Sequence, residues 1–263
     1  YFLKLAKRAT TILEKVGYNF CPNGHMASNM LWCKSMSDWI KQYNNWMKTP
    51  GEKSNDISSI FFDYELVFGE GKIEDSLDDL ILKNTKNNAL FFDYLGNDTL
   101  RKNPPINFFK KFNLEEEGEH KGKFDIKNRA IMPLVDGARL FAISLNLKGI
   151  NNTYVRFKQL AIADPKFSEI YLNCADAFLI LTKFRTLEGL KNDSTGDYIN
   201  IDELSKVDKE KLKKQVDFLD QNQEAIIYLE NFITSKIKNN SCFTISILSL
   251  SAESITKTTE FVF

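Results

Sequence analysis

The sequence has little of several features that mark particular classes of protein. Its 263 residues include only four cysteines, six prolines and two histidines. The cysteines lack paired CxxC spacing and are too few for a disulfide scaffold, so a reduced, cytoplasmic setting is expected. No apolar run approaches the roughly 18 residues of a membrane-spanning helix, and no basic-then-apolar signal peptide opens the chain. We therefore expect no membrane partner.

An excess of charge of one sign is also missing. Lys plus Arg and Asp plus Glu number 35 each, which gives a formal net charge of zero. A balanced chain has no overall field that attracts nucleic acid, so we expect no nucleic-acid partner, and any binding site must rest on local charge. The sequence also has no Gly-rich phosphate loop, no Ser-His-Asp order and no kinase signature.

The residues that are present favour a mainly helical chain of the α+β class. Hydrophobic residues make up 43% and charged residues 27%, which is enough for a sizeable core. Ser35, with Asp38 three residues later, is a variant of the capping box that starts a helix. Residues 108–126 are expected to form a short hairpin with a charged turn. The helical period predicts helices over residues 2–16, 36–49, 76–95, 129–147, 153–162, 165–190 and 208–237.

One stretch, SSIFFDYELVFGE at residues 58–70, has the alternation of a strand. We expect the clearest strand over residues 57–68, with Phe62 and Tyr64 on its core face. Asp63 and Glu65 would then lie side by side on the other face. Two carboxylates on a wet face can bind a divalent metal through oxygen ligands, although a polar strand face is the more ordinary interpretation.

Several segments resemble, in the same order, one bacterial family of nucleotidyltransferases. They are CPNGHMASNMLWCKSMSDW, SIFFDYELVFGE, NPPINFFKKFNLEEEGEHKGKFDIKNRAIMPLVDGARLFAI and DYINIDELSKVDKEKLK. The family is related to the uridylyltransferase of the PII signalling protein, and its members often carry cyclic-nucleotide-binding or CBS modules upstream. The resemblance implies the C-terminal part of a nucleotidyltransferase α/β domain over residues 1–103, a helical-bundle, substrate-binding domain over 104–240, and an unassigned tail over 241–263.

The resemblance also implies a metal site. In such enzymes a Gly-Ser turn, an Asp-x-Asp pair and a third carboxylate hold two magnesium ions, which bind a nucleoside triphosphate for in-line displacement at its α-phosphorus. Asp63 matches the third carboxylate, so it is the implied catalytic and metal-binding residue. Glu65 departs from the family, in which this position is more often basic and meets the triphosphate.

Substrate-binding residues follow from the same resemblance. Lys127, Arg139 and Arg185 are expected to line one groove of the helical domain. Asp136 and Arg139 lie one helical turn apart and can pair with a ligand or with each other, and the pairing alone is favoured. The implied substrate-binding residues are Ser28, Asn29, Lys127, Asp136, Arg139 and Arg185.

The Gly-Ser and Asp-x-Asp motifs are missing from the sequence and are expected just upstream of Tyr1, so this chain alone is expected to be inactive. Three functions stay open. The chain is a fragment of an enzyme that transfers a nucleotidyl group to a protein or small-molecule acceptor, a non-catalytic nucleotide-sensing or protein-interaction module in signal transduction, or a plain helical interaction domain.

Asp63 is expected to face a cleft, so Asp63→Asn would change stability by no more than about half a kcal/mol.

Overall fold

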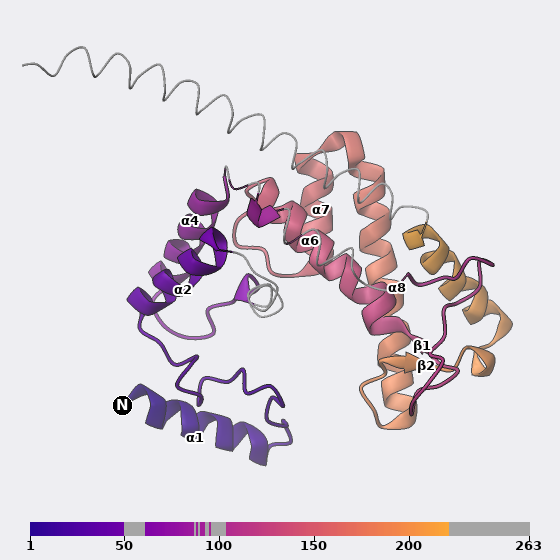
Figure 1. Ribbon diagram of the computed structural model, residues 1–263, viewed down its shortest axis with the longest axis horizontal. Coiled ribbons are helices and arrows are strands. Elements are labelled where there is room, and N and C mark those ends of the chain that lie inside the picture. The colour runs from indigo at the N-terminus through magenta and orange to yellow at the C-terminus, as the bar shows by residue number, and fades with distance from the viewer. Residues whose placement is uncertain (50–60, 87, 89, 93–94, 96–103, 221–263) are drawn as a thin grey trace, which may run out of the picture. The chain divides into compact units, whose positions relative to one another are not determined.

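The computed structural model describes residues 1–49, 61–86, 88, 90–92, 95 and 104–220. Helices dominate these residues, and the strands are short (Figure 1). The mainly helical α+β class is therefore confirmed. Contacts divide the chain into an N-terminal unit, Tyr1–Trp46, and a C-terminal unit, Met47–Phe263.

The N-terminal unit contains helix α1 (Phe2–Lys15) and the start of helix α2 (Met36–Lys48). The helix predicted over residues 2–16 ends at Lys15, and Gly17, two residues later, has a φ of 101° in the left-handed region that glycine tolerates. The capping box before α2 is also confirmed. The amide of Asp38 donates to Ser35 Oγ at 3.2 Å, and that hydroxyl donates to Asp38 Oδ2 at 2.7 Å. The described residues of this unit form no strand.

Rings gather in the N-terminal unit around the predicted stripe of α2. Trp39 stacks on Trp32 with ring centroids 6.3 Å apart, and it also lies near Tyr43 and Trp46. Tyr43 and Trp46 are buried, as the helical period predicts. The aromatic side chains of CPNGHMASNMLWC therefore fix an otherwise irregular loop against α2.

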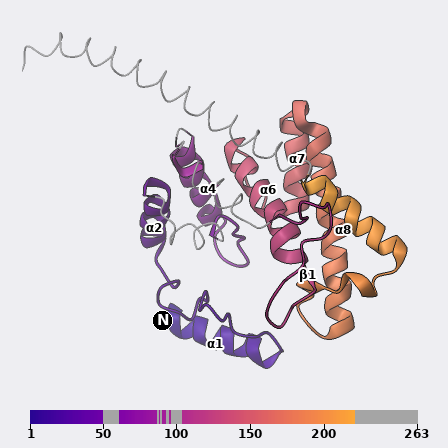
Figure 2. The same cartoon turned by 45° about the vertical axis from the view of Figure 1, so that its right-hand side comes forward.

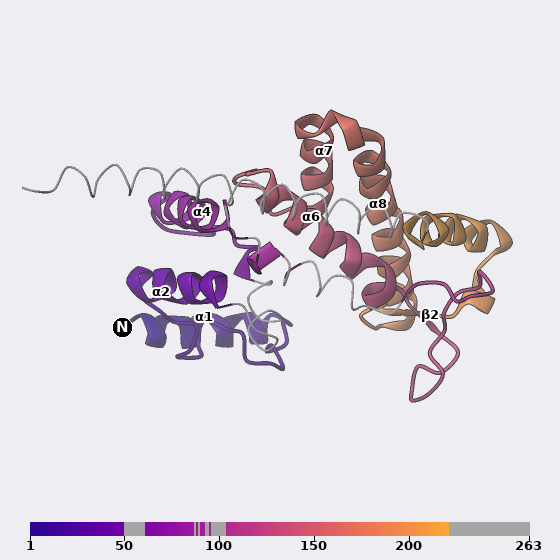
Figure 3. The same cartoon turned by 45° about the horizontal axis from the view of Figure 1, so that its top comes forward.

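In the C-terminal unit, three helices lie side by side in all three views (Figures 1, 2 and 3). They are α6 (Met132–Ser144), α7 (Thr153–Ala163) and α8 (Ser168–Asn192). α6 continues from a π-helical turn, η1 (Lys127–Ile131), and α8 follows a 3-10 turn, η2 (Pro165–Phe167). Helix α4 (Lys72–Thr85) contacts α6. The helices predicted over 129–147, 153–162 and 165–190 are thus confirmed with small shifts at their ends.

A two-stranded sheet lies near one end of α8, where β1 (Phe124–Asp125) pairs antiparallel with β2 (Tyr198–Ile199). The hairpin predicted over 108–126 is only partly correct. Glu115 and Lys123 are joined by a backbone hydrogen bond of 2.9 Å across the charged turn, but strand β1 takes β2 as its partner. The 3-10 turn η3 (Ile201–Glu203) and a helix over 206–220 follow, and the rest of the helix predicted to 237 lies outside the described residues.

The predicted strand over 57–68 is wrong for its described part. Residues 61–70 form one residue of helix, then turns and bends, and residues 57–60 lie outside the described residues. Phe62 is buried and contacts Phe91, but Val67 and Phe68 are 95% and 97% exposed. The segment has no strand partner among the described residues, so side-chain contacts hold it instead. The next helix also begins earlier than predicted, at Lys72 rather than Ser76.

Within the described residues, no helix is both long enough and apolar enough to cross a membrane.

Candidate functional site

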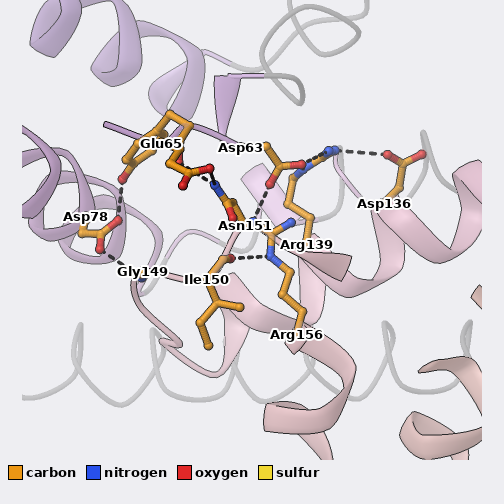
Figure 4. A network of polar contacts seen from close by, with 10 residues as sticks. Asp63, Glu65, Asp78, Asp136, Arg139, Gly149, Ile150, Asn151 and Arg156 are labelled. Carbon is orange, nitrogen blue, oxygen red and sulfur yellow. Dashed lines mark hydrogen bonds and ion pairs between the residues drawn. The ribbon is translucent and has the colours of Figure 1, made fainter. Parts of the chain in front are cut away.

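Asp63 lies at the centre of a network of ion pairs in the C-terminal unit (Figure 4). Arg139 of α6 donates from Nε to Asp63 Oδ2 at 3.0 Å, and its Nη2 contacts the same oxygen. Arg156 of α7 forms an ion pair with the other carboxylate oxygen, Oδ1. The side chains of Arg139 and Arg156 are 7% and 5% exposed, and that of Asp63 is 25% exposed. Asp63 therefore forms ion pairs with two buried guanidinium groups at once.

Local structure explains how both arginines reach Asp63. Asp136 lies one turn before Arg139 on α6 and accepts a hydrogen bond from its Nη1 at 3.1 Å, which orients the side chain. Asn152 caps the start of α7, and its side chain accepts from the amide of Val155. Arg156 also donates from Nε to the carbonyl oxygen of Ile150 at 2.7 Å, so the α6–α7 loop fixes this guanidinium as well.

A polar cavity of about 220 Å³ lies beside this network. Its wall includes Phe62, Tyr64 and Glu65 from the Asp63 segment, Asp78 from α4, and Asn151 and Arg156 from the start of α7 and the loop before it. The Tyr64 hydroxyl donates to Asp78. The Asn151 side chain donates to Glu65 Oε2 at 3.2 Å (Figure 4).

The Nη1 atom of Arg156 is buried and makes no hydrogen bond to any described residue. A buried donor without a partner costs free energy, so it indicates a place for a water molecule or a ligand oxygen. Arg156 also lines the cavity, so its guanidinium group adds a positive charge to the wall.

The described residues do not fit a magnesium site at Asp63. Its two oxygens face guanidinium groups, and a divalent cation there would be repelled by both. Glu65 does not lie beside Asp63 as a second ligand but takes Asn151 as its partner. No group of three or more His, Cys, Asp or Glu in the described part of the chain could hold a metal ion. The role of Asp63 at a complete metal site stays a prediction.

The expectation that Asp63 faces an open cleft is corrected by the same contacts. The expectation assumed an alternating strand, and the segment is a turn that directs the carboxylate to Arg139 and Arg156. Removing the charge of Asp63 would leave two buried cations with too few acceptors. Asp63→Asn is therefore no longer expected to be neutral for stability.

The three cations predicted to line one groove are only partly brought together. Lys127 and Arg185 both bind Asp197, at 3.3 Å from Lys127 Nζ and 2.7 Å from Arg185 Nε. Arg139 pairs with Asp63 and Asp136 instead, and it follows Lys127 by twelve residues of continuous helical backbone. At 1.5 Å a residue this is about 18 Å, so one groove does not contain all three.

Asp197 has a lowered pKa, which predicts a pH dependence. Burial alone would raise its pKa, but hydrogen bonds from Thr195, Arg185 and Lys127 outweigh burial and lower it below 3.8. A carboxyl group with a lowered folded-state pKa stabilises the fold above its unfolded pKa and loses this contribution as the pH falls through the folded pKa. We expect urea unfolding between pH 5 and pH 3 to show a smaller loss of stability for Asp197→Asn than for the wild type.

Asp176→Asn is the matched control for that measurement, because Asp176 is an exposed acid of α8 without an ion pair among the described residues. Its pH profile is expected to follow the wild type. An Asp197→Asn profile parallel to that of the wild type would show that Asp197 contributes no pH-dependent stability.

Ser28 and Asn29 lie in the loop of the N-terminal unit. The Asn29 side chain donates to the Gly24 carbonyl oxygen at 3.0 Å and accepts from the amide of Leu31 at 3.0 Å. Both ends of this amide therefore stabilise the loop, and the substrate-binding role of the two residues stays a prediction.

Two functional candidates were missed by sequence reasoning, Arg156 and Asn151. A signal for Arg156 was available. The buried residues of α7 include Thr153, Phe157 and Leu160, and Arg156 falls on the same helical face. A charged residue on a core face needs a partner, which marks it as a candidate for an ion pair or a ligand contact. Asn151 gave no such signal, because asparagine is ordinary before a helix.

Comparisons with known proteins identify the family. Residues 89–228 match the family model described as "Putative nucleotidyltransferase substrate binding domain", and residues 1–53 match the model "Putative nucleotidyltransferase DUF294". Searches of curated proteins and of solved structures found no match. The first match covers more than half of the chain, and the second lies before it in the order that the resemblance implies. The chain therefore belongs to this family of nucleotidyltransferases with a substrate-binding domain.

Proposed function

We propose that the chain is part of a nucleotidyltransferase of the PII-uridylyltransferase-like type. The enzyme transfers a nucleotidyl group from a nucleoside triphosphate to a protein or small-molecule acceptor, with magnesium in the complete reaction. The polar cavity beside Asp63 is the observation that carries the proposal. It is walled both by the segment that resembles the catalytic carboxylate and by the start of α7 in the substrate-binding part.

Arg156 supports a phosphate group as the occupant of this cavity, whose wall also carries Lys148 and the acids Glu65, Glu74 and Asp78. The guanidinium of Arg156 is buried in the wall, and its Nη1 has no acceptor in the described structure. A phosphate oxygen is a suitable acceptor because guanidinium groups form strong, charge-assisted hydrogen bonds with phosphate. These side chains contribute binding and orientation, and no described group supplies a metal site.

Glu65 weakens this proposed site, which yields a direct test. Its carboxylate lines the cavity at the position where the family more often has a basic residue. We expect Glu65→Lys to tighten binding of ATP or UTP by about tenfold, because the change replaces a repulsive charge near the phosphates by an attractive one. Isothermal titration calorimetry at about 0.1 M salt measures both affinities.

Glu70→Lys makes the same charge change in the same segment, and Glu70 is exposed like Glu65 but does not line the cavity. It is expected to leave the affinity within about twofold of the wild type, since exposed charges are screened over roughly 10 Å at 0.1 M salt. Equal affinities for Glu65→Lys and Glu70→Lys, or no binding of either nucleotide by any variant, would contradict the proposal.

Turnover by this chain alone is expected to be negligible. Magnesium gives up its water reluctantly and relies on several fixed oxygen ligands, and the described residues provide no such group. A coupled pyrophosphate assay with ATP or UTP should show no difference between magnesium and EDTA. Magnesium-dependent release of pyrophosphate that Asp63→Asn abolishes would show that this expectation is wrong.

One observation favours a second candidate, a non-catalytic nucleotide-sensing or protein-interaction module in signal transduction. Both carboxylate oxygens of Asp63 form ion pairs with arginines, which is typical of an acid with a structural role. Such a module would bind the nucleoside triphosphate without transferring any part of it. Incubation with α-labelled nucleotide and a candidate acceptor, such as a PII-type signalling protein, distinguishes the two, because only the enzyme labels the acceptor. Cyclic-nucleotide-binding or CBS modules would act as the upstream sensor in either case.

A further inference from the structure

A second, larger cavity of the C-terminal unit is lined mainly by α8 and the helix over 206–220. It has a volume of about 590 Å³, which falls within the range of roughly 300–1,000 Å³ typical of small-molecule sites. None of its lining residues belongs to the Asp63 network or to the polar cavity beside it.

Helical periodicity produces an apolar floor for this cavity. Ile180, Phe184 and Leu187 recur on one face of α8, and Ile199 of β2 and Leu204 close the floor from the opposite side. Leu187 is 52% exposed, so part of this apolar surface is uncovered in the described structure. An uncovered apolar surface inside a concavity favours a ligand with an apolar body.

The rim carries charges of both signs, with one more lysine than acids. Four lysines line the cavity together with three acids, and every one of the acids is engaged. Glu203 binds Lys191 at 2.7 Å, Asp208 accepts from the Ser205 hydroxyl at 2.7 Å, and Glu188 accepts from Asn192 at 2.8 Å. The other three lysines, Lys183, Lys211 and Lys214, form no ion pair with any described residue.

We propose that this cavity binds an organic anion with an apolar, aliphatic body, whose charged group lies among Lys183, Lys211 and Lys214. The three ammonium groups supply strong donors to a carboxylate, sulfonate or phosphate. The floor has one aromatic ring and otherwise aliphatic side chains, with few polar groups that would recognise a nucleobase. The inference is independent of nucleotidyl transfer, because it uses residues that the proposed triphosphate site does not share.

The dye 8-anilinonaphthalene-1-sulfonate is a suitable probe, since it combines an apolar body with a sulfonate and its fluorescence rises on binding. The experiment compares the wild type with the double variant Lys211→Glu/Lys214→Glu. The variant is expected to bind the dye at least fivefold more weakly at this site. A matched control, Lys158→Glu/Lys206→Glu, changes the net charge equally at exposed lysines outside the cavity and is expected to keep the wild-type affinity.

Competition identifies the chemistry of the ligand. Decanoate is expected to displace the dye bound in this cavity, which is the binding that Lys211→Glu/Lys214→Glu weakens. Inorganic phosphate at the same concentration is not expected to displace it. Leu187→Glu places an acid on the apolar floor at a half-exposed position, so it is expected to weaken dye binding in the same cavity. Circular dichroism checks that each variant is folded. Equal binding by the Lys211→Glu/Lys214→Glu variant and its control, or displacement by phosphate alone, would overturn the proposal.

Discussion

Asp63→Asn is expected to lower the free energy of unfolding by about 2–3 kcal/mol. The substitution leaves the buried guanidinium groups of Arg139 and Arg156 without their shared counter-charge. Breaking a fully buried pair by removing one partner costs about 3–5 kcal/mol. The expected effect is smaller here, because the Asp63 side chain is 25% exposed and water partly replaces the lost charge. Urea denaturation followed by circular dichroism measures the change.

Asp79→Asn is the control for that substitution. Asp79 also forms an ion pair, with Lys148, but both side chains are more than half exposed. Exposed pairs contribute about 0–1 kcal/mol, so this variant should remain close to the wild type. If both variants lose the same stability, the buried arginines do not depend on Asp63 and the network is not a structural unit.

Phe157→Ala is expected to have the largest effect, a loss of about 3–5 kcal/mol of stability. Phe157 follows Arg156 on α7 and is fully buried against residues of α6 and α8, including Leu134, Phe141 and Tyr171. Truncation removes apolar contacts and leaves a cavity that a rigid three-helix core cannot fill. The same packing fixes the rotation of α7 and so directs Arg156 toward Asp63.

Val155→Ala tests whether that loss is specific to the core. Val155 lies on the same helix but is 41% exposed, and alanine is a better helix former, so its effect should stay within about half a kcal/mol. Phe157→Ala should also weaken nucleotide binding, because α7 would no longer hold Arg156 in place. A stable Phe157→Ala protein with unchanged ATP affinity would contradict the packing described for α7.

Local features of the fold could be predicted from the sequence. The capping box at Ser35 and Asp38 depends on residues three apart, and the Asp136–Arg139 pair depends on one helical turn. Both follow from backbone geometry within a few residues. The predicted helices of the C-terminal unit were confirmed for the same reason, since their apolar residues repeat at the helical period.

Long-range contacts explain what could not be predicted. The alternation at residues 58–68 has the pattern of a strand, but a strand needs a partner, and a single sequence does not show whether one exists. β1 likewise found its partner in β2, more than seventy residues later along the chain, instead of in the nearby hairpin.

The contacts of Asp63 are also long-range and could not be predicted from the sequence. The resemblance identified Asp63 as an important acid, yet its partners are Arg139 and Arg156, which lie far from it in the sequence. Charge alone does not distinguish Arg156 from the other cations of the chain. Arg156 is distinguished by its burial on the core face of α7. The spacing of Thr153, Phe157 and Leu160 in the sequence is enough to identify this face.

Photoaffinity labelling with ATP that carries an azidoanilide on its γ-phosphate tests the central claim most directly, because it locates the phosphate end of the nucleotide. After irradiation and proteolysis, mass spectrometry identifies the labelled residues. The proposed triphosphate site predicts labels within residues 62–66 or 148–156, the two segments that contribute to the wall of the polar cavity beside Asp63. It also predicts that these labels are lost when unlabelled ATP is added. Labels confined to other parts of the chain, or labels that unlabelled ATP does not remove, would contradict it.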